Sequence, residues 1–107
     1  MKVDITVSNR KGKKMTAVFY DDSGKRLKTV HFGSKPNKDF TIYSRELGKA
    51  EAEQKRSNYI KRHQVREDFG NPQTAGALSR WILWNKPTVA SSVADFRRRF
   101  KLTPLSK

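Results

Sequence analysis

Clusters of Lys and Arg are the side chains of this sequence whose chemistry is easiest to interpret. Residues 97–101 place three consecutive arginines at the end of a predicted helix, with Asp95 as the only nearby acid. Three successive helical residues spread over about 200° around the axis, so they cannot all meet one carboxylate. We therefore expect at least two guanidinium groups to face outward, where they could bind phosphate. The alternative is a solvated helix end.

Two more basic clusters have the same character. Lys55-Arg56 and Lys61-Arg62 are separated by about six residues on a predicted helix, which returns both pairs to nearly one face. A basic loop at residues 10–14 joins the first two predicted strands. Phosphate contacts position a protein on nucleic acid without reading its sequence. The predicted nucleic-acid-binding residues are Arg10, Lys11, Lys13, Lys14, Lys55, Arg56, Lys61, Arg62, Arg97, Arg98 and Arg99.

The overall charge favours a polyanionic partner. The chain has 24 Lys and Arg against 10 Asp and Glu, a formal charge of +14. Residues 1–44 and 72–107 hold most of this excess, so we expect two charged poles. Solubility alone needs a smaller net charge. Nucleic acid, with double-stranded DNA as the first choice, is the expected partner; acidic proteins and anionic lipid surfaces are the alternatives.

Other chemistries have little support in the sequence. There is no cysteine, no phosphate-binding G-x-x-x-x-G-K-[ST] motif and no G-x-S-x-G motif. His63 and Glu67 have the i,i+4 spacing of half a metal site, but no motif supplies further ligands. We expect His63 to pack beside Tyr59. The sequence predicts a protein that is not an enzyme and needs no metal or cofactor.

The length of 107 residues predicts one domain of the α+β class. Alternation at Val3, Ile5 and Val7 and two β-rich runs at residues 15–20 and 27–32 predict an antiparallel meander within residues 1–44. A short extended piece is expected at residues 40–43. Residues 103–107 are expected to form a tail. No apolar run is long enough for a membrane span.

Helices are expected over most of residues 45–102. A long polar helix is predicted at 45–67, with its first half projecting into solvent or onto a partner. Asn71-Pro72 resembles the start of a second helix, buried on all sides, that continues to Trp84. Thr88, Ser91 or Ser92 begins a third helix with an apolar stripe. Trp81 and Trp84 are interpreted as core residues, with a stacking platform for unpaired bases as the alternative.

Several segments resemble a known group of proteins. Residues 62–88 and 92–100, together with upstream segments at 17–33 and 39–41, resemble an uncharacterised family of short basic proteins encoded by large DNA viruses and some phages. The resemblance covers about residues 15–102, and the string T-A-G-A-L-S-R-W-I-L-W-N-K-P-T makes it specific. It leaves out residues 1–14, and residues 43–53 depart from the family pattern. It implies a viral origin but no functional residue.

These observations lead to two hypotheses of different classes. The first is a virion-associated protein that neutralises nucleic-acid phosphates without sequence specificity. The second is a minor capsid or cement protein whose extended N-terminus and Arg-rich last helix clamp acidic faces of viral coat proteins, since Arg pairs with carboxylates as readily as with phosphates. Either protein would reside in the virion, and in the host-cell cytoplasm or replication compartment during infection.

Overall fold

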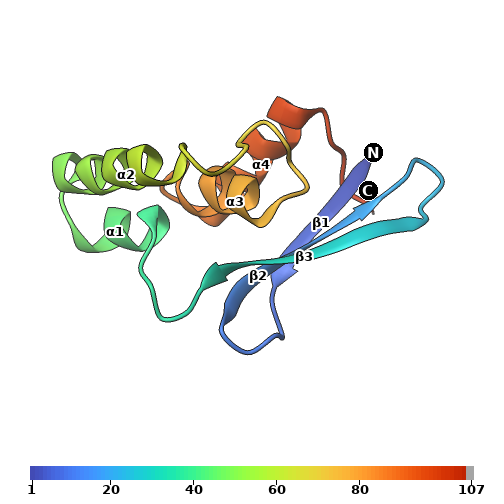
Figure 1. The fold of residues 1–107 in the computed structure, drawn as a ribbon, viewed down its shortest axis with the longest axis horizontal. Coiled ribbons are helices and arrows are strands. Elements are labelled where there is room, and N and C mark those ends of the chain that lie inside the picture. Colours follow the sequence, from blue (N-terminus) through green and yellow to red (C-terminus); the bar gives the residue numbers. More distant parts are fainter. Residues whose placement is uncertain (106–107) are drawn as a thin grey trace.

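The computed structural model describes residues 1–105 and has an α+β fold (Figure 1). An antiparallel sheet at the N-terminus is followed by helices, as the sequence predicts. The predicted tail at 103–107 includes residues 106 and 107, which lie outside the described part. The elements in chain order are β1 (Lys2–Val7), β2 (Lys13–Tyr20), β3 (Arg26–Ser34), α1 (Phe40–Glu46), α2 (Lys49–His63), α3 (Ala75–Leu78), the π-helical turn η1 (Ser79–Leu83) and α4 (Val89–Phe100).

The sheet is a meander in the order β1-β2-β3. Val3 pairs with Phe19, and Met15 pairs with Phe32, so alternate apolar residues of neighbouring strands share one face. The turn between β2 and β3 depends on Asp21, whose carboxylate accepts hydrogen bonds from the backbone of Ser23 and Lys25. Gly24 supplies the positive φ, +93°, that this turn requires. The predicted hairpin is confirmed.

The helices lie on one side of the sheet and enclose the core against it (Figure 1). The sheet contributes its inward-facing apolar residues, the chain from α3 to η1 contributes three more, and α4 contributes one. Both tryptophans pack against this core, but neither is fully buried. The buried core consists of Val3, Ala17, Phe19, Phe32, Leu78, Ile82, Leu83, Phe96 and Leu102.

The predicted extended piece at residues 40–43 is wrong, because these residues begin α1. Asp39 caps this helix: its side chain accepts a hydrogen bond from the backbone N–H of Ile42. The β-branched and aromatic run that suggested a strand is overridden by this cap and by the burial of Phe40 and Thr41.

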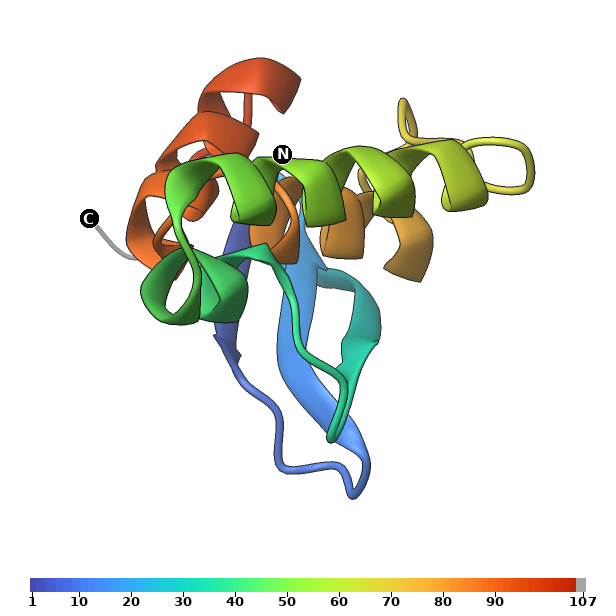
Figure 2. The ribbon, with the colours of Figure 1, turned by 90° about the vertical axis from the view of Figure 1, so that its left-hand side faces the viewer.

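The predicted long helix is shorter and lies against the protein. It begins at Lys49 rather than 45 and ends at His63 rather than 67. Gly48 separates it from α1, so the two helices form a hairpin in which they lie side by side (Figure 2). Ala52 is only 1% exposed. The expected projection of the first half of this helix is therefore wrong, because that half packs on α1.

The next helix begins at Thr74, not at Asn71-Pro72. The Thr74 side chain accepts from the backbone N–H of Ala77, and α3 continues directly into η1. Thr88 starts α4 in the same way, by accepting from the backbone N–H of Ser91, which confirms the first of the three predicted caps.

The end of the described chain returns to the first strand. Thr103 forms an isolated parallel bridge with Lys2, and its carbonyl accepts a hydrogen bond of 2.9 Å from the backbone N–H of Val3. Leu102 is buried beside the strand. Residues 102 and 103 therefore lie close to the first residues of the chain (Figure 1).

Candidate nucleic-acid interface

Two adjoining hollows lie between the sheet and the helices. The first hollow, of about 480 Å³, is bounded by the end of β3, α1, the last turn of α2 and α3. The second hollow, of about 560 Å³, lies along β3 beside residues 73–75. Lys13 and Ala75 line both hollows, so the two adjoin. We call them together the basic groove.

The second hollow is lined by cations without a counter-charge. Arg10, Lys13 and Lys28 contribute to its wall, and no Asp or Glu is among the residues that line it. Arg10 and Lys28 are exposed. His31, in the middle of β3, also lines this hollow. This combination gives a concave surface with a positive potential.

The first hollow has a more balanced set of charges. Asp39 in its wall is buried and pairs with Lys14, with 2.7 Å between Nζ and Oδ2. Lys38, also in the wall, pairs at 2.6 Å with Glu46, which lies outside the hollow, and Glu67 adds a second carboxylate to the lining. Lys14 is therefore committed to an internal ion pair, and this departs from its predicted role in binding phosphate.

A stack of aromatic rings forms part of the first hollow. Tyr59 lies between His63 and Trp84, with ring centroids 4.1 Å and 4.2 Å away. The predicted packing of His63 beside Tyr59 is confirmed. Burial raises the pKa of Tyr59 to about 12. Because both faces of the Tyr59 ring are occupied by its neighbours, this stack joins α2 to η1 and leaves that ring no face for a base.

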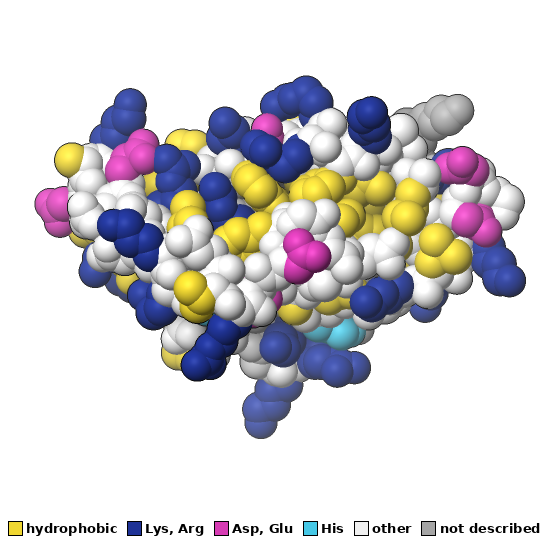
Figure 3. All heavy atoms as spheres, turned by 45° about the horizontal axis from the view of Figure 1, so that its top comes forward, with side chains coloured by type: hydrophobic (Ala, Val, Ile, Leu, Met, Phe, Trp, Pro, Cys, Tyr) yellow, Lys and Arg dark blue, Asp and Glu magenta, His cyan; other side chains and the backbone are white. Residues whose placement is uncertain are grey.

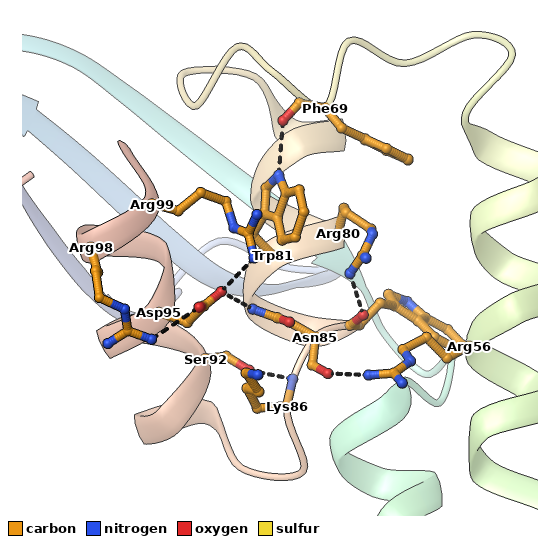
Figure 4. Close-up of polar contacts among 11 residues, drawn as sticks. Arg56, Phe69, Arg80, Trp81, Asn85, Lys86, Ser92, Asp95, Arg98 and Arg99 are labelled. Atoms are coloured by element: carbon orange, nitrogen blue, oxygen red, sulfur yellow. Dashed lines mark hydrogen bonds and ion pairs between the residues drawn. The ribbon is translucent and has the colours of Figure 1, made fainter. Parts of the chain in front are cut away.

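Two of the three arginines of α4, Arg98 and Arg99, pair with one carboxylate while remaining exposed, as the sequence predicts for at least two of them (Figure 4). Asp95 accepts hydrogen bonds from Asn85 at 2.7 Å, from Arg98 at 3.1 Å and from Arg99 at 3.3 Å. The hydrogen bond from Asn85, assisted by Arg99 and opposed by burial, holds the pKa of Asp95 below its ordinary value. Arg97 donates to the carbonyl of Val3, and its Nε is buried without a partner in the described chain.

Two further guanidinium groups donate to the backbone carbonyls that follow η1. Arg80 donates to the carbonyl of Trp84 at 2.8 Å, and Arg56 donates to the carbonyl of Asn85 at 2.6 Å. Cations are favoured beside the last carbonyls of a helix. Burial, followed by repulsion from Arg56 and Arg99, lowers the pKa of Arg80. The sequence analysis missed Arg80, which stands alone among apolar residues and belongs to no basic cluster.

Trp81 lies between the guanidinium groups of Arg80 and Arg99 (Figure 4). The central carbons of Arg80 and Arg99 are 4.2 Å and 3.9 Å from its ring centroid, and its indole N–H donates to the carbonyl of Phe69 at 2.8 Å. Its contacts are those of a packed side chain, with the polar end satisfied and the ring covered by cations.

The structure divides the predicted binding residues into three groups. Arg10, Lys13, Lys14 and Arg62 line the basic groove. Lys11, Lys55 and Lys61 are exposed outside it, with Lys55 over the ring of Tyr43. Arg56, Arg97, Arg98 and Arg99 have partners within the chain.

The face drawn in Figure 3 does not show two separate basic poles. Lys and Arg surround an apolar area in the middle of the face in Figure 3 rather than gathering at one side of it. The end of α4 lies far from the turn between β1 and β2 in both ribbon views (Figures 1 and 2). The groove also includes Lys28, Lys38 and His31, which the sequence analysis did not select, because an isolated residue in a strand or turn gives no cluster signal.

Residues 1–105 contain neither a cluster of metal ligands nor a membrane-spanning helix. No three His, Asp or Glu side chains there come together as ligands for a metal ion. No helix of this part of the chain combines the length and the apolar character that crossing a membrane requires.

Comparison with protein families gives a match over the N-terminal part of the chain. Residues 3–47 match the model of a family of unknown function, DUF5754. The match covers the three strands and α1, which is less than half of the chain. It agrees with the resemblance to an uncharacterised family, but its extent differs: it includes residues 3–14 and ends before the string at 62–88. No curated protein and no solved structure matches the chain.

Proposed function

We propose that this protein binds the phosphates of nucleic acid without reading base sequence, and that the basic groove is its binding surface. The observation that supports this most is the second hollow, whose lining includes Arg10, Lys13 and Lys28 but no acidic residue. Arg10 lies in the turn between β1 and β2, Lys13 begins β2, and Lys28 lies in β3. The fold therefore brings together charges that are separate in the sequence.

The groove fits phosphate better than base edges. Its lining supplies Lys and Arg, which neutralise phosphate, and Arg62 continues the positive charge into the first hollow. Reading a base in duplex DNA requires a helix or ribbon that presents Asn, Gln or Arg to the major groove. The last turn of α2 places Arg62 at the first hollow, with Lys61 exposed outside it, and this arrangement favours backbone contacts.

The alternative of a clamp on acidic coat proteins is less well supported. It relied on an extended N-terminus and on the arginines of α4. The N-terminus forms strand β1 within the sheet, and the arginines are engaged with Val3 and Asp95. We also propose that this nucleic-acid-binding protein resides in the virion, since compact packing of a genome requires neutralised phosphates.

The salt dependence of DNA binding tests the proposed function. Binding of random duplex DNA should weaken linearly in log Kd against log salt, with a slope near about 0.9 per phosphate contact. Replacing Arg10, Lys13 and Lys28 together with Gln should lower that slope by about 2 to 3. Unrelated DNA sequences should compete equally.

A charge-matched variant provides the control. Lys25, Lys49 and Lys86 are exposed and line neither hollow, so changing all three to Gln removes the same charge elsewhere. This control should change the slope by less than about 1. Equal losses in both variants would mean that the charge acts without a defined surface, and the groove assignment would be wrong. A wild-type slope below about 2 would overturn phosphate binding itself.

A further inference from the structure

His31 occupies a constrained position in the wall of the second hollow. Its Nδ1 lies 3.0 Å from the hydroxyl oxygen of Ser8 and 2.8 Å from that of Thr16. Ser8 and Thr16 are both buried, at 7% and 9% exposure. Two buried hydroxyl groups therefore fix the orientation of Nδ1. The other ring nitrogen, Nε2, contacts neither of them.

The hydrogen bonds around Ser8 leave its hydroxyl hydrogen available for Nδ1 of His31. The Ser8 hydroxyl oxygen already accepts the backbone N–H of Arg10 at 3.0 Å, so its own hydrogen can be donated to Nδ1. A neutral imidazole that accepts at Nδ1 carries its hydrogen on Nε2. Within residues 1–105, Nε2 has no hydrogen-bond partner, so it remains able to donate.

The same hydroxyl connects the imidazole to the basic turn. Ser8 holds the backbone of Arg10, whose carbonyl accepts the backbone N–H of Lys13 at 3.1 Å. His31, Arg10 and Lys13 are thus held by one hydrogen-bonded segment, and Lys28 joins them from β3. No carboxylate lines the hollow to compete for these donors.

We propose that the second hollow is a phosphate-binding subsite in which His31 Nε2–H donates to a phosphate oxygen and Arg10, Lys13 and Lys28 neutralise its charge. Ser8 and Thr16 are positioning residues that hold the imidazole in the donating tautomer. This inference rests on the proposed function, because the phosphodiester backbone is one source of such a group. Free inorganic phosphate offers the same chemistry.

Imidazole NMR on the wild-type protein tests the subsite directly. The chain has two histidines, and His63, which lines only the first hollow, reports whether a ligand reaches that hollow as well. The two-bond ¹H–¹⁵N spectrum should show His31 protonated at Nε2. Addition of inorganic phosphate or, separately, of a short DNA duplex should shift its signals saturably, more than those of His63.

The outcomes separate the subsite from the broader proposal. A shift with the duplex alone assigns the hollow to the backbone, and a shift with inorganic phosphate alone assigns it to free phosphate. Duplex binding without any response of His31 leaves nucleic-acid binding standing and overturns the subsite. A spectrum with the proton on Nδ1 alone also overturns it. Absence of binding to both ligands overturns both proposals.

Variants extend the test without relying on His31 itself. Lys28 is exposed, so Lys28→Gln should keep the fold and weaken phosphate binding by about tenfold. The matched change Lys25→Gln lies at the hairpin tip outside both hollows and should have little effect. Thr16→Val should broaden or displace the His31 signals and weaken binding while His63 keeps its chemical shifts. Equal affinities for the Lys28 and Lys25 variants would refute the subsite.

Discussion

Replacing Asp95 with Ala tests whether the arginines of α4 belong to the architecture of the protein or are free to bind a partner. Asp95 is 8% exposed and receives hydrogen bonds from Asn85, Arg98 and Arg99. If this carboxylate organises the end of α4, its removal should destabilise the fold. If the arginines are independent surface charges, the effect should be small.

The size of the effect follows from the burial of each partner. Asn85 is only 6% exposed and would lose the acceptor for its side-chain amide, which costs about 1–3 kcal/mol. The side chains of Arg98 and Arg99 are 72% and 43% exposed, so solvent screening limits their two ion pairs to about 1 kcal/mol together. We expect a total loss of about 3 kcal/mol, or roughly 12 °C in Tm.

Urea and thermal unfolding at several pH values measure this loss. The lowered pKa of Asp95 in the folded state means that its carboxylate stabilises the protein above about pH 4 and loses this contribution as the pH falls below that value. The difference between wild type and Asp95→Ala should therefore be largest near pH 7 and should narrow in acid.

Arg98→Gln provides the matched control, because Arg98 is the most exposed partner of Asp95. It should change stability by less than about 0.5 kcal/mol. A loss below about 1 kcal/mol for Asp95→Ala at neutral pH would refute the role of Asp95 as the centre of this cluster. The arginines of α4 would then return as candidates for binding an anionic partner.

Two further predictions concern positions where sequence and structure lead to different expectations. Lys14→Gln should cost about 3 kcal/mol in urea unfolding, because it leaves the carboxylate of Asp39 buried at 3% exposure without its ion pair; a neutral effect would mean that Lys14 is available to bind phosphate. Gly33→Ala should lower Tm more than Gly24→Ala: both have positive φ, but a Cβ at Gly33 would meet Leu83 Cδ1 at 2.7 Å and one at Gly24 meets nothing within 4 Å. Equal losses would show that backbone strain alone determines both costs.

The sheet could be predicted from sequence because its pattern is local. Alternating apolar residues define the inward face of each strand, and Asp21 with Gly24 defines the turn between two of them. The segment at residues 40–46 has the composition of a strand, yet it forms a helix. Its helical state depends on the cap at Asp39 and on burial of Phe40, beside which the Arg56 guanidinium lies at 4.4 Å from the ring centroid. Contacts of that kind are tertiary and leave no periodic signal.

The candidate site could be predicted only in part, for the same reason. Sequence clusters identify where positive charge is dense, and Arg10 and Lys13 were found in this way. Lys28 and His31 lie in an alternating strand and gain significance only when the fold makes them line one hollow with Arg10 and Lys13. Arg56 shows the reverse case. It belongs to a dense basic cluster in the sequence, but in the fold it donates to the carbonyl of Asn85, 29 residues away.

The bridge between Thr103 and β1 has a consequence for how the chain reaches its native state. β2 and β3 can pair as soon as their turn forms, because their partners are close in sequence. The outer edge of β1 gains its backbone partner only from a residue about one hundred positions later. During synthesis, which proceeds from the N-terminus, the first strand to emerge is thus the last to have its outer edge covered. The order in which the polypeptide is made and the order in which its sheet is completed run in opposite directions.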